Sequence, residues 1–465
     1  MSDLTVDSTA RDQAAAVRRR EVSARELLDL HLARIGERNP ELNAIVSLDE
    51  ERAREGAAAA DERLASGAEV GPLHGLPFAF KDTHDVAGWR TTYGSPLYAD
   101  HVPDRDDLVV ERVRRAGVVV IGKTNVPEFA AGSHTFNRVF GLTRNPVDPR
   151  RSAGGSSGGA ACALAAGMVP LADGSDMGGS LRNPASFCGV VGLRPSLGRV
   201  PQWPSANQWE TTSVAGPMAR NAGDLALLLS VLAGPDPRAP QALGDPGSAF
   251  APPVVGSLAG LRVALSVDLG GAFEVDEEVA AVVSSAAPVL AAAGASVDAA
   301  HPVLTEAEDT FRTLRAWHFQ ATFGDELRAH PDAFKPALAD NIRAGEGLTG
   351  ADVARGFAQR TALSERMREF FGPGGYDVLV LPVSQVPPFP ADQEYPTSIN
   401  GRPMETYLDW MRSAYFITVT GCPAISVPFG RTAAGLPVGL QLVAAHGRDR
   451  FLLEVAAAVE AEVAR

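Results

Sequence analysis

Short apolar runs recur along this chain, and stretches with helical character separate them. The runs are bounded by Gly, Pro or charged residues and span 76–80, 118–121, 168–172, 261–265 and 377–381. Runs of this length between turn residues predict buried β-strands. Because helical segments lie between them, we expect an α/β fold in which a sheet is covered by helices.

The helical segments are 9–36, 51–65, 109–116 and most of 305–371. The clearest start signal is Ser23 with Glu26, which together form a capping box before a run of apolar positions. The segment 234–253 is rich in Pro, Gly and Asp and predicts a loop. Since strand-like runs continue on both sides of the long helical region, no domain boundary is predicted.

Composition narrows the classes of function. The 465 residues carry a net charge of -14, which argues against non-specific nucleic-acid binding and against anionic membrane surfaces. No basic start leads into an apolar region, and no run of about 18 uncharged apolar residues occurs, so we expect neither a secretory signal nor a membrane span. Cys162, Cys188 and Cys422 are far apart and odd in number, and no Cys/His pair has zinc spacing. We therefore expect a cytoplasmic protein without a metal ion.

A lysine stands at the end of the first predicted strand. Lys81 follows the run 76–80, and lysine otherwise occurs only at 123 and 335 among 42 basic residues. An ammonium at the end of a buried strand is poorly solvated, which lowers its pKa and lets the neutral amine act as a base. The alternative, with equal weight, is a surface lysine whose aliphatic stem alone is covered.

A glycine-rich loop at 153–159 carries two adjacent hydroxyls, Ser156 and Ser157. Glycines permit close backbone approach, and neighbouring hydroxyls can relay protons. A flexible loop or a helix N-cap would have the same composition, and the Gly-Lys-Ser/Thr of a phosphate-binding loop is absent. The segment also matches Gly-x-Ser157-x-Gly, the nucleophile elbow of α/β-hydrolases, so an esterase that uses Ser157 is the main alternative.

A second glycine-rich loop at 174–184 reads GSDMGGSLRNP. Its consecutive backbone N–H groups could converge on one developing oxyanion, and they belong to Met177, Gly178, Gly179 and Ser180. Asp176 and Arg182 bracket the loop and could pin it with an ion pair. A simple turn between a strand and a helix is the alternative.

Histidine is the usual partner of a catalytic serine, and lysine is the known replacement. His84, His134 and His446 are the candidates, but none lies in a glycine-framed segment. Each is expected to be an ordinary surface or core residue.

Taken together, these segments resemble the amidase signature family of serine hydrolases. The resemblance is dense from 71 to 195, where it includes GKTNVPEFA at 122–130 and FGLTRNP at 140–146. It resumes at 420–430 and 435–443 and is weak between 201 and 375. The most specific part is the Gly-Gly-Ser-Ser-Gly-Gly loop, with a Lys upstream and a Gly-Gly-Ser about two dozen residues later.

The resemblance implies the family's fold, which is α/β with a single large mixed β-sheet, helices on both faces and a helical insert. The whole chain, 1–465, would form one amidase domain. Its expected parts are an N-terminal helical part (1–70), the catalytic sheet core (71–232 and 377–465) and a helical insert near the substrate entrance (305–375).

The resemblance also implies a Ser–cis-Ser–Lys triad. Ser180 matches the nucleophile, Lys81 matches the base, and Ser156 matches the bridging serine, whose peptide bond with Gly155 would be cis. The matching supporting residues are Ser157, Asp176 and Arg182. The candidate substrate contacts are Ala131, Gly155 and, from the divergent segment 201–216, Trp209. No cofactor is implied.

Three residues depart from the commonest family pattern. Ser175 stands where Thr is usual, Met177 where Thr or Ile is usual, and Asn183 where Gln, Phe or Ile is frequent. The N–H group of Met177 can still serve an oxyanion, but its side chain is expected to narrow or line the acyl pocket.

The expected reaction is cleavage of the C–N bond of a small amide, anilide or carbamate (urethane) through a Ser180 acyl-enzyme, and of esters as well. The alternatives are the glutaminase subunit of a tRNA-dependent amidotransferase and a catalytically inactive scaffold. We expect a small-molecule partner, neither nucleic acid nor membrane, and a monomer or homodimer. The loop 382–404 is a candidate lid. Further aromatic candidates for the entrance are Trp203, Trp317, Tyr407, Trp410 and Phe416.

Overall fold

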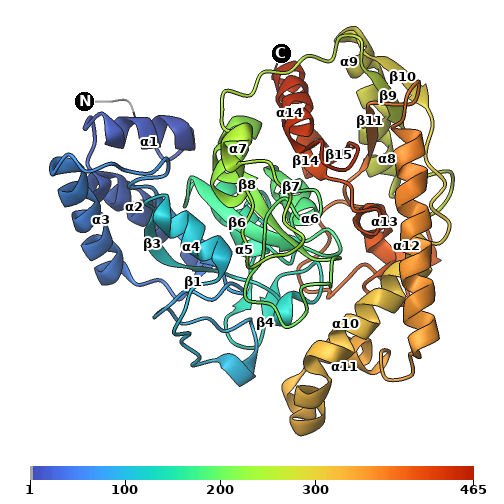
Figure 1. The fold of residues 1–465 in the computed structure, drawn as a ribbon, viewed down its shortest axis with the longest axis horizontal. Helices are drawn as coiled ribbons and strands as arrows, with labels where there is room; N and C mark the ends of the chain where they lie inside the picture. Colours follow the sequence, from blue (N-terminus) through green and yellow to red (C-terminus); the bar gives the residue numbers. More distant parts are fainter. Residues whose placement is uncertain (1–3, 465) are drawn as a thin grey trace.

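A mixed eight-stranded sheet forms the centre of the molecule, as seen in the computed structural model, which describes residues 4–464 (Figure 1). Its strand order is β10-β9-β11-β15-β14-β7-β8-β6. The strand β9 pairs in parallel with β10 and β11, and the remaining pairs are antiparallel. The strands are β6 (Leu171–Asp176), β7 (Val191–Arg194), β8 (Val214–Ala219), β9 (Arg262–Leu265), β10 (Ser296–Ala299), β11 (Val378–Pro382), β14 (Ala424–Arg431) and β15 (Pro437–Val443). The predicted fold class is confirmed.

A small three-stranded sheet, ordered β1-β3-β2, stands beside the edge strand β6. Its strands are β1 (Ile45–Val46), β2 (Pro77–Lys81) and β3 (Val119–Thr124). The Lys81 N–H group donates to Asp173 Oδ1 at 3.0 Å, so a side chain of β6 joins the two sheets. Two short hairpins complete the strands: β4 (Phe136–Asn137) with β5 (Gly141–Leu142), and β12 (Ser398–Ile399) with β13 (Arg402–Pro403).

The predicted strands agree with the structure except at one place. The run 168–172 becomes β6 only from Leu171, and the strand continues through polar residues to Asp176. Apolar patterning misses this extension because Asp173 and Asp176 have partners within the protein that offset the cost of their burial. The sheet also takes β9 and β10 from 262–299, between the two ranges expected to form the sheet core.

Helices cover the sheets and extend to either side of them (Figure 1). The capping box of Ser23 and Glu26 begins the second helix, as predicted. The α-helices are α1 (Ala10–Arg18), α2 (Ala24–Leu42), α3 (Glu50–Ala65), α4 (Leu108–Arg115), α5 (Gly158–Ala165), α6 (Arg182–Cys188), α7 (Ala222–Leu232), α8 (Glu277–Ser284), α9 (Ala286–Ala292), α10 (Ala307–Ala329), α11 (Pro336–Arg343), α12 (Gly350–Phe370), α13 (Arg412–Thr418) and α14 (Asp449–Val463). Short 3-10 helices are η1 (Pro96–Tyr98), η2 (Glu128–Ala130), η3 (Gly247–Phe250), η4 (Pro331–Ala333) and η5 (Asp409–Met411).

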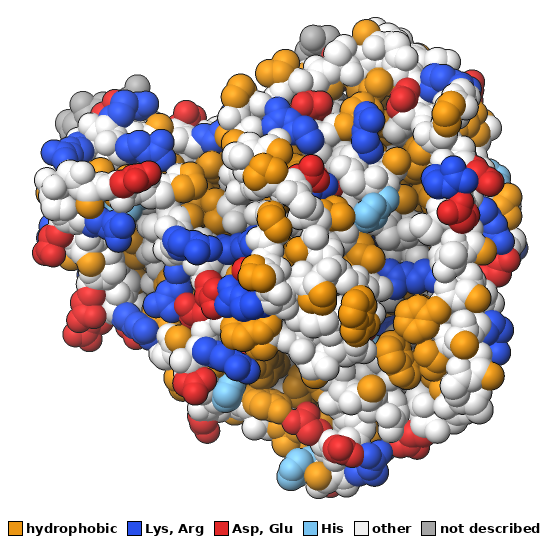
Figure 2. All heavy atoms as spheres, in the orientation of Figure 1, with side chains coloured by type: hydrophobic (Ala, Val, Ile, Leu, Met, Phe, Trp, Pro, Cys, Tyr) orange, Lys and Arg blue, Asp and Glu red, His pale blue; other side chains and the backbone are white. Residues whose placement is uncertain are grey.

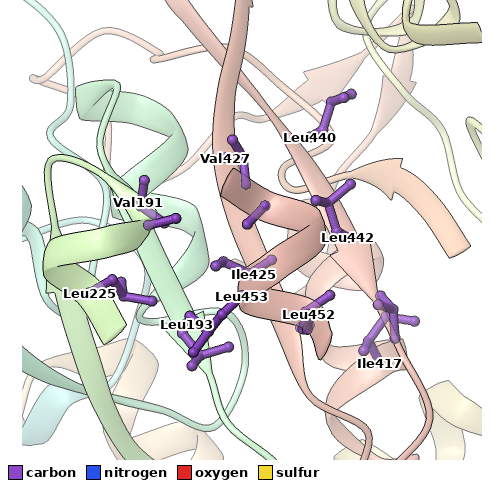
Figure 3. Close-up of a cluster of buried hydrophobic side chains, with 14 of the residues drawn as sticks. Val191, Leu193, Leu225, Ile417, Ile425, Val427, Leu440, Leu442, Leu452 and Leu453 are labelled. Atoms are coloured by element: carbon purple, nitrogen blue, oxygen red, sulfur yellow. The ribbon is translucent and has the colours of Figure 1, made fainter. Parts of the chain in front are cut away.

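The main core lies between the central sheet and the helices α7, α13 and α14 (Figure 3). Alternate residues of neighbouring strands point to the same side, so β7, β14 and β15 present a continuous apolar face. The side chains labelled there are Val191, Leu193, Leu225, Ile417, Ile425, Val427, Leu440, Leu442, Leu452 and Leu453. Each Å² of apolar surface that these side chains remove from water stabilises the domain by roughly 25 cal/mol.

The long helices α10 and α12 and the short α11 form the expected helical segment between 305 and 371 and lie together on one side of the molecule (Figure 1). None of the helices between residues 4 and 464 combines the length and the apolar character that crossing a bilayer requires.

Candidate active site

Lys81 lies at the end of β2 and is completely buried. Its Nζ donates to Ser156 Oγ at 2.8 Å, to Ser157 Oγ at 2.9 Å and to Ser175 Oγ at 3.0 Å. Two of these oxygens come from the glycine-rich loop at 153–159, and the third comes from the end of β6. The structure therefore brings the predicted base into direct contact with the predicted bridging serine.

Burial sets the electrostatics of this lysine. The pKa of Lys81 is lowered from 10.5 to about 7, because burial disfavours the ammonium, while the carboxylates of Asp173 and Asp176 partly oppose the shift. Near neutral pH, Lys81 is consequently an uncharged amine in a large fraction of the molecules. A neutral amine that contacts hydroxyl groups can remove a proton from them.

The loop that carries Ser156 leads into α5 and is fixed by hydrogen bonds to its backbone. The Gly155–Ser156 peptide bond is cis, as the family resemblance implies. Ser133 Oγ donates to the Gly155 carbonyl at 2.9 Å, and Ser157 stands at the N-cap of α5. Gly159 is needed for close approach, since a Cβ there would lie 2.3 Å from the backbone nitrogen of Asn125.

The loop that carries Ser180 joins β6 to α6, and Asp176 holds it in place. Asp176 accepts from the N–H groups of Gly179 at 3.0 Å and Leu181 at 3.2 Å, and it pairs with Arg182 at 2.8 Å. Burial raises the pKa of Asp176, but Arg182 and the neighbouring Arg194 outweigh this and hold it below its usual range. The predicted ion pair across the loop is therefore present and fully buried.

Three of the four predicted oxyanion donors are free to act. The Gly179 N–H group is used by Asp176, whereas those of Met177, Gly178 and Ser180 have no acceptor in the part of the chain that the structure describes. Their role as an oxyanion hole stays a prediction.

Ser180 itself is 7% exposed, so its hydroxyl lies at the inner end of the site and not on the surface. The Ser157 N–H group donates to the Ser180 carbonyl at 3.1 Å and so joins the two loops. Within residues 4–464, Ser180 Oγ makes no hydrogen bond, and the Ser156–Ser180 step of the relay stays a prediction.

The helical segment 305–343 packs against Met177 and Ala131. Met177 and the buried Ala131 belong to an apolar cluster with side chains of α10 and α11. Arg315 Nη1 lies 3.0 Å from Met177 Sδ, and Lys335 Nζ donates to the Ala131 carbonyl at 2.7 Å. The candidate contact Ala131 and the side chain of Met177 therefore lie beneath helices of the predicted insert. That Ala131 and Gly155 touch a substrate stays a prediction.

A cavity of about 380 Å³ reaches Ser175, next to the base. Its aromatic lining consists of Tyr93, Tyr98, Phe129 and Phe323. Figure 2 shows a face on which hydrophobic side chains lie recessed in a hollow, with charged side chains of both signs around it. Rings in such a cavity suit an apolar or aromatic part of a ligand.

The structure places the other candidate residues as follows. Trp209 is 66% exposed, and its role as a substrate contact stays a prediction. Trp410 and Phe416 are buried in the core, whereas Tyr407 accepts a hydrogen bond from Arg315. Among residues 4–464, no group of three His, Cys, Asp or Glu side chains is arranged to hold a metal ion.

The sequence analysis missed Asp173, and it treated His84 as an ordinary surface or core residue. The buried Asp173 binds the Lys81 N–H group, and His84 lies between Asp173 and Asp107 at 3.3 and 3.2 Å. The only signal in the sequence is an aspartate inside a strand that is otherwise apolar or small. His134, by contrast, contacts the Ala391 carbonyl and Ser152, and burial lowers its pKa to about 4.

Comparisons with known proteins agree with this geometry. The family model described as Amidase matches residues 26–453. The chain is 38% identical to an acylamidase of Rhodococcus erythropolis over 459 residues, which is 97% of this chain and 95% of that protein. It is 36% identical to a glutamyl-tRNA(Gln) amidotransferase subunit of Synechococcus sp. (strain CC9605), covering 94% of this chain and 92% of that protein.

Solved structures show the same likeness. A bacterial aryl acylamidase of the amidase signature family superposes with a TM-score of 0.90 at 28% identity, covering 98% of this chain and 96% of that one. A 6-aminohexanoate cyclic dimer hydrolase superposes with a TM-score of 0.87 at 31% identity, covering 99% of both chains. By family model, relatives and fold, the chain belongs to the amidase signature family of hydrolases.

Proposed function

We propose that this enzyme cleaves small amides through an acyl-enzyme on Ser180, with Lys81 as the base and Ser156 as the relay. The observation that carries the proposal is the 2.8 Å contact between Lys81 Nζ and Ser156 Oγ in a fully buried setting. Burial favours the neutral amine, which is the form that can accept a proton. Ser156 then provides a path from the amine toward the loop of Ser180.

The proposed cycle has two halves. In the first, Lys81 accepts the proton of Ser156 while Ser156 accepts that of Ser180, and Ser180 Oγ bonds to the carbonyl carbon. The free N–H groups of the loop stabilise the oxyanion, and each such donor contributes about 2.7–4 kcal/mol. The C–N bond then breaks as the relay returns a proton to the leaving nitrogen.

In the second half, water replaces the amine. The relay removes a proton from the water as its oxygen bonds to the acyl carbon, and the bond to Ser180 Oγ breaks. Ser180 recovers its proton and the carboxylic acid leaves. No step requires a group other than the substrate, water and the chain's own residues.

Amides with an aromatic or apolar portion form the proposed substrate class. The aromatic cavity beside Ser175 supports this choice, and so do the relatives named acylamidase and aryl acylamidase. Carbamates and esters carry the same electrophilic carbonyl and belong to the proposed range. A small molecule is the proposed partner.

Two other functions compete with this proposal. An esterase that uses Ser157 is disfavoured because Ser157 is fully buried, its hydroxyl accepts from Lys81, and its N–H group is bonded to Ser180. A glutaminase role is kept as a test outcome because relatives named as glutamyl-tRNA(Gln) amidotransferase subunits are up to 36% identical to the chain.

A hydrolysis panel tests the proposal. It contains a primary amide, an anilide, a phenyl carbamate, an ester and glutamine, and it is run with the wild type, Ser180→Ala, Lys81→Ala and the exposed control Ser257→Ala. We expect turnover of the anilide by the wild type and the control, and its loss in the two site variants, whose circular dichroism stays unchanged. Wild-type rates in Ser180→Ala would refute the proposal, and turnover of glutamine alone would favour the glutaminase.

A further inference from the structure

A buried arginine without a carboxylate partner lies over the nucleophile loop. Arg315 of α10 is 6% exposed. Its hydrogen bonds all go to neutral groups: Met177 Sδ at 3.0 Å, Tyr407 Oη at 2.6 Å and Asn341 Oδ1 at 3.3 Å. No Asp or Glu among residues 4–464 forms an ion pair with it. A buried charge is ordinarily paired, because an unpaired one loses its hydration without compensation.

Other buried arginines of this chain show the difference. Arg182, Arg194 and Arg199 have carboxylate oxygens at 2.8, 3.4 and 3.0 Å. Arg360 has no ion pair either, but it donates to two main-chain carbonyl oxygens. Arg315 therefore differs from these four in having neither a carboxylate nor a main-chain carbonyl acceptor, with N–H groups left to donate.

Arg315 also lies beside the loop that carries Ser180. One turn earlier on α10, Phe311 touches the loop, since a Cβ on Gly178 would lie 3.2 Å from its ring. Met177, which contacts Arg315, precedes the nucleophile by three residues. The same face of α10 thus covers the loop that holds Ser180 and presents a cation beside it.

Packing fixes the orientation of the guanidinium. It lies 4.0 Å from the centroid of the Phe319 ring and is held at its other side by Tyr407. The nearby Lys335 already has partners for its charge, because its Nζ lies 3.7 Å from Glu394 and donates to the Ala131 carbonyl. The net charge of -14 attracts no anion, so recognition of one here requires a local cation.

We infer that Arg315 binds a carboxylate carried on the acyl chain of the substrate, so that the enzyme acts on ω-carboxyacyl amides. This inference rests on the proposed amidase function and names its substrate class. The planar guanidinium can give two parallel N–H donors to a carboxylate. The methylene chain between the carboxylate and the scissile carbonyl would pack on the apolar side chains of Met177 and Phe319, which belong to one cluster.

The first test compares matched substrates. Each mono-anilide of succinic, glutaric and adipic acid is paired with a neutral analogue in which an isopropyl group replaces the carboxylate. We expect at least one acid to exceed its analogue about 10- to 100-fold in kcat/KM, the range of a charge-assisted hydrogen-bonded pair. Arg315→Gln should remove that preference, and Arg315→Lys should keep part of it.

Arg312→Gln is the matched control, because Arg312 lies on the same helix but is paired with Glu308 and Asp409. It should leave the preference for the acid unchanged. A wild type that hydrolyses the anilides but prefers no acid over its analogue, or an Arg315→Gln variant that keeps the wild-type preference, overturns the inference.

The second test measures binding without turnover. Calorimetry of the three acids and their analogues is done with Ser180→Ala and with Ser180→Ala carrying Arg315→Gln. We expect the second substitution to weaken binding of the preferred acid at least about tenfold and to leave its analogue within about twofold. Equal binding of acid and analogue by Ser180→Ala overturns the inference. Arginine-dependent binding of the acid without any amide hydrolysis by the wild type supports it and refutes the proposed function instead.

Discussion

Turnover should rise with pH through the titration of Lys81. Burial lowers the pKa of this lysine from 10.5 to about 7. The working form is the deprotonated amine, so activity is lost as pH falls through about 7, and tenfold for each further unit. A lysine with a pKa of 10.5 would be neutral in only about one molecule in 3000 at about pH 7. Burial therefore supplies about a thousandfold more of the base.

Asp173→Asn tests the electrostatic origin of this behaviour. Asp173 is fully buried, and its negative charge favours the Lys81 ammonium. Asparagine keeps an oxygen that can accept from the Lys81 N–H group, now 3.0 Å away, but it removes the charge. The pKa of Lys81 should fall further. The acidic limb of the pH profile of kcat/KM should therefore move to lower pH by about one unit, within the range expected of a nearby charge.

The assay is kcat/KM for an anilide between about pH 5 and pH 9. The control is Glu365→Gln, which removes one negative charge from an exposed site on α12 and should leave the limb where it is. An apparent pKa above about 9 in the wild type, or a limb that moves to higher pH in Asp173→Asn, would refute the reasoning.

Three further predictions concern the loop and the fold. Gly179→Ala should destabilise the protein by about 1–3 kcal/mol in thermal unfolding and should slow turnover. The reason is that the φ of Gly179 is +108° and that a Cβ there would lie 2.6 Å from a neighbouring methyl group. An unchanged Tm contradicts this prediction. Arg182→Met should cost about 3–5 kcal/mol in urea unfolding, since it breaks the 2.8 Å pair and leaves the buried Asp176 with the longer, 3.4 Å contact to Arg194 as its ion pair. A loss under about 1 kcal/mol would show that the Arg182 pair is not needed. Burial raises the pKa of Glu460 to about 7, above its value in the unfolded chain. Since the unfolded chain then loses this proton at lower pH than the folded protein does, the wild type should lose stability as the pH rises from about 5 to about 8. Glu460→Gln has no such proton to lose and should lose less stability over the same range. Equal losses in both proteins would contradict the assignment.

The predictions that succeeded rest on local sequence. Ser23 and Glu26 form their capping box because both partners belong to one turn. Lys81 and Ser156 could be paired because their segments match a family pattern, and the structure places them 2.8 Å apart. The short apolar runs predicted strands of both sheets, whereas the single large mixed sheet was implied by the family resemblance.

The features that were missed depend on contacts between distant segments. Arg315 reaches Met177 across 138 positions of sequence, and no local pattern marks either residue as a partner of the other. Asp173 continues a strand past its apolar run because it binds Lys81, 92 positions away. One miss is local instead: the Gly179 N–H group, predicted to face the oxyanion, donates to Asp176, three residues earlier in the same loop.

Covalent labelling tests the central claim most directly. The wild type, Lys81→Ala and Ser180→Ala are incubated with a fluorophosphonate, and the modified peptide is identified by mass spectrometry. The account predicts one adduct, on Ser180 of the wild type, slowed strongly in Lys81→Ala and absent from Ser180→Ala. An adduct on Ser157, or labelling of Ser180 at an unchanged rate in Lys81→Ala, would contradict it.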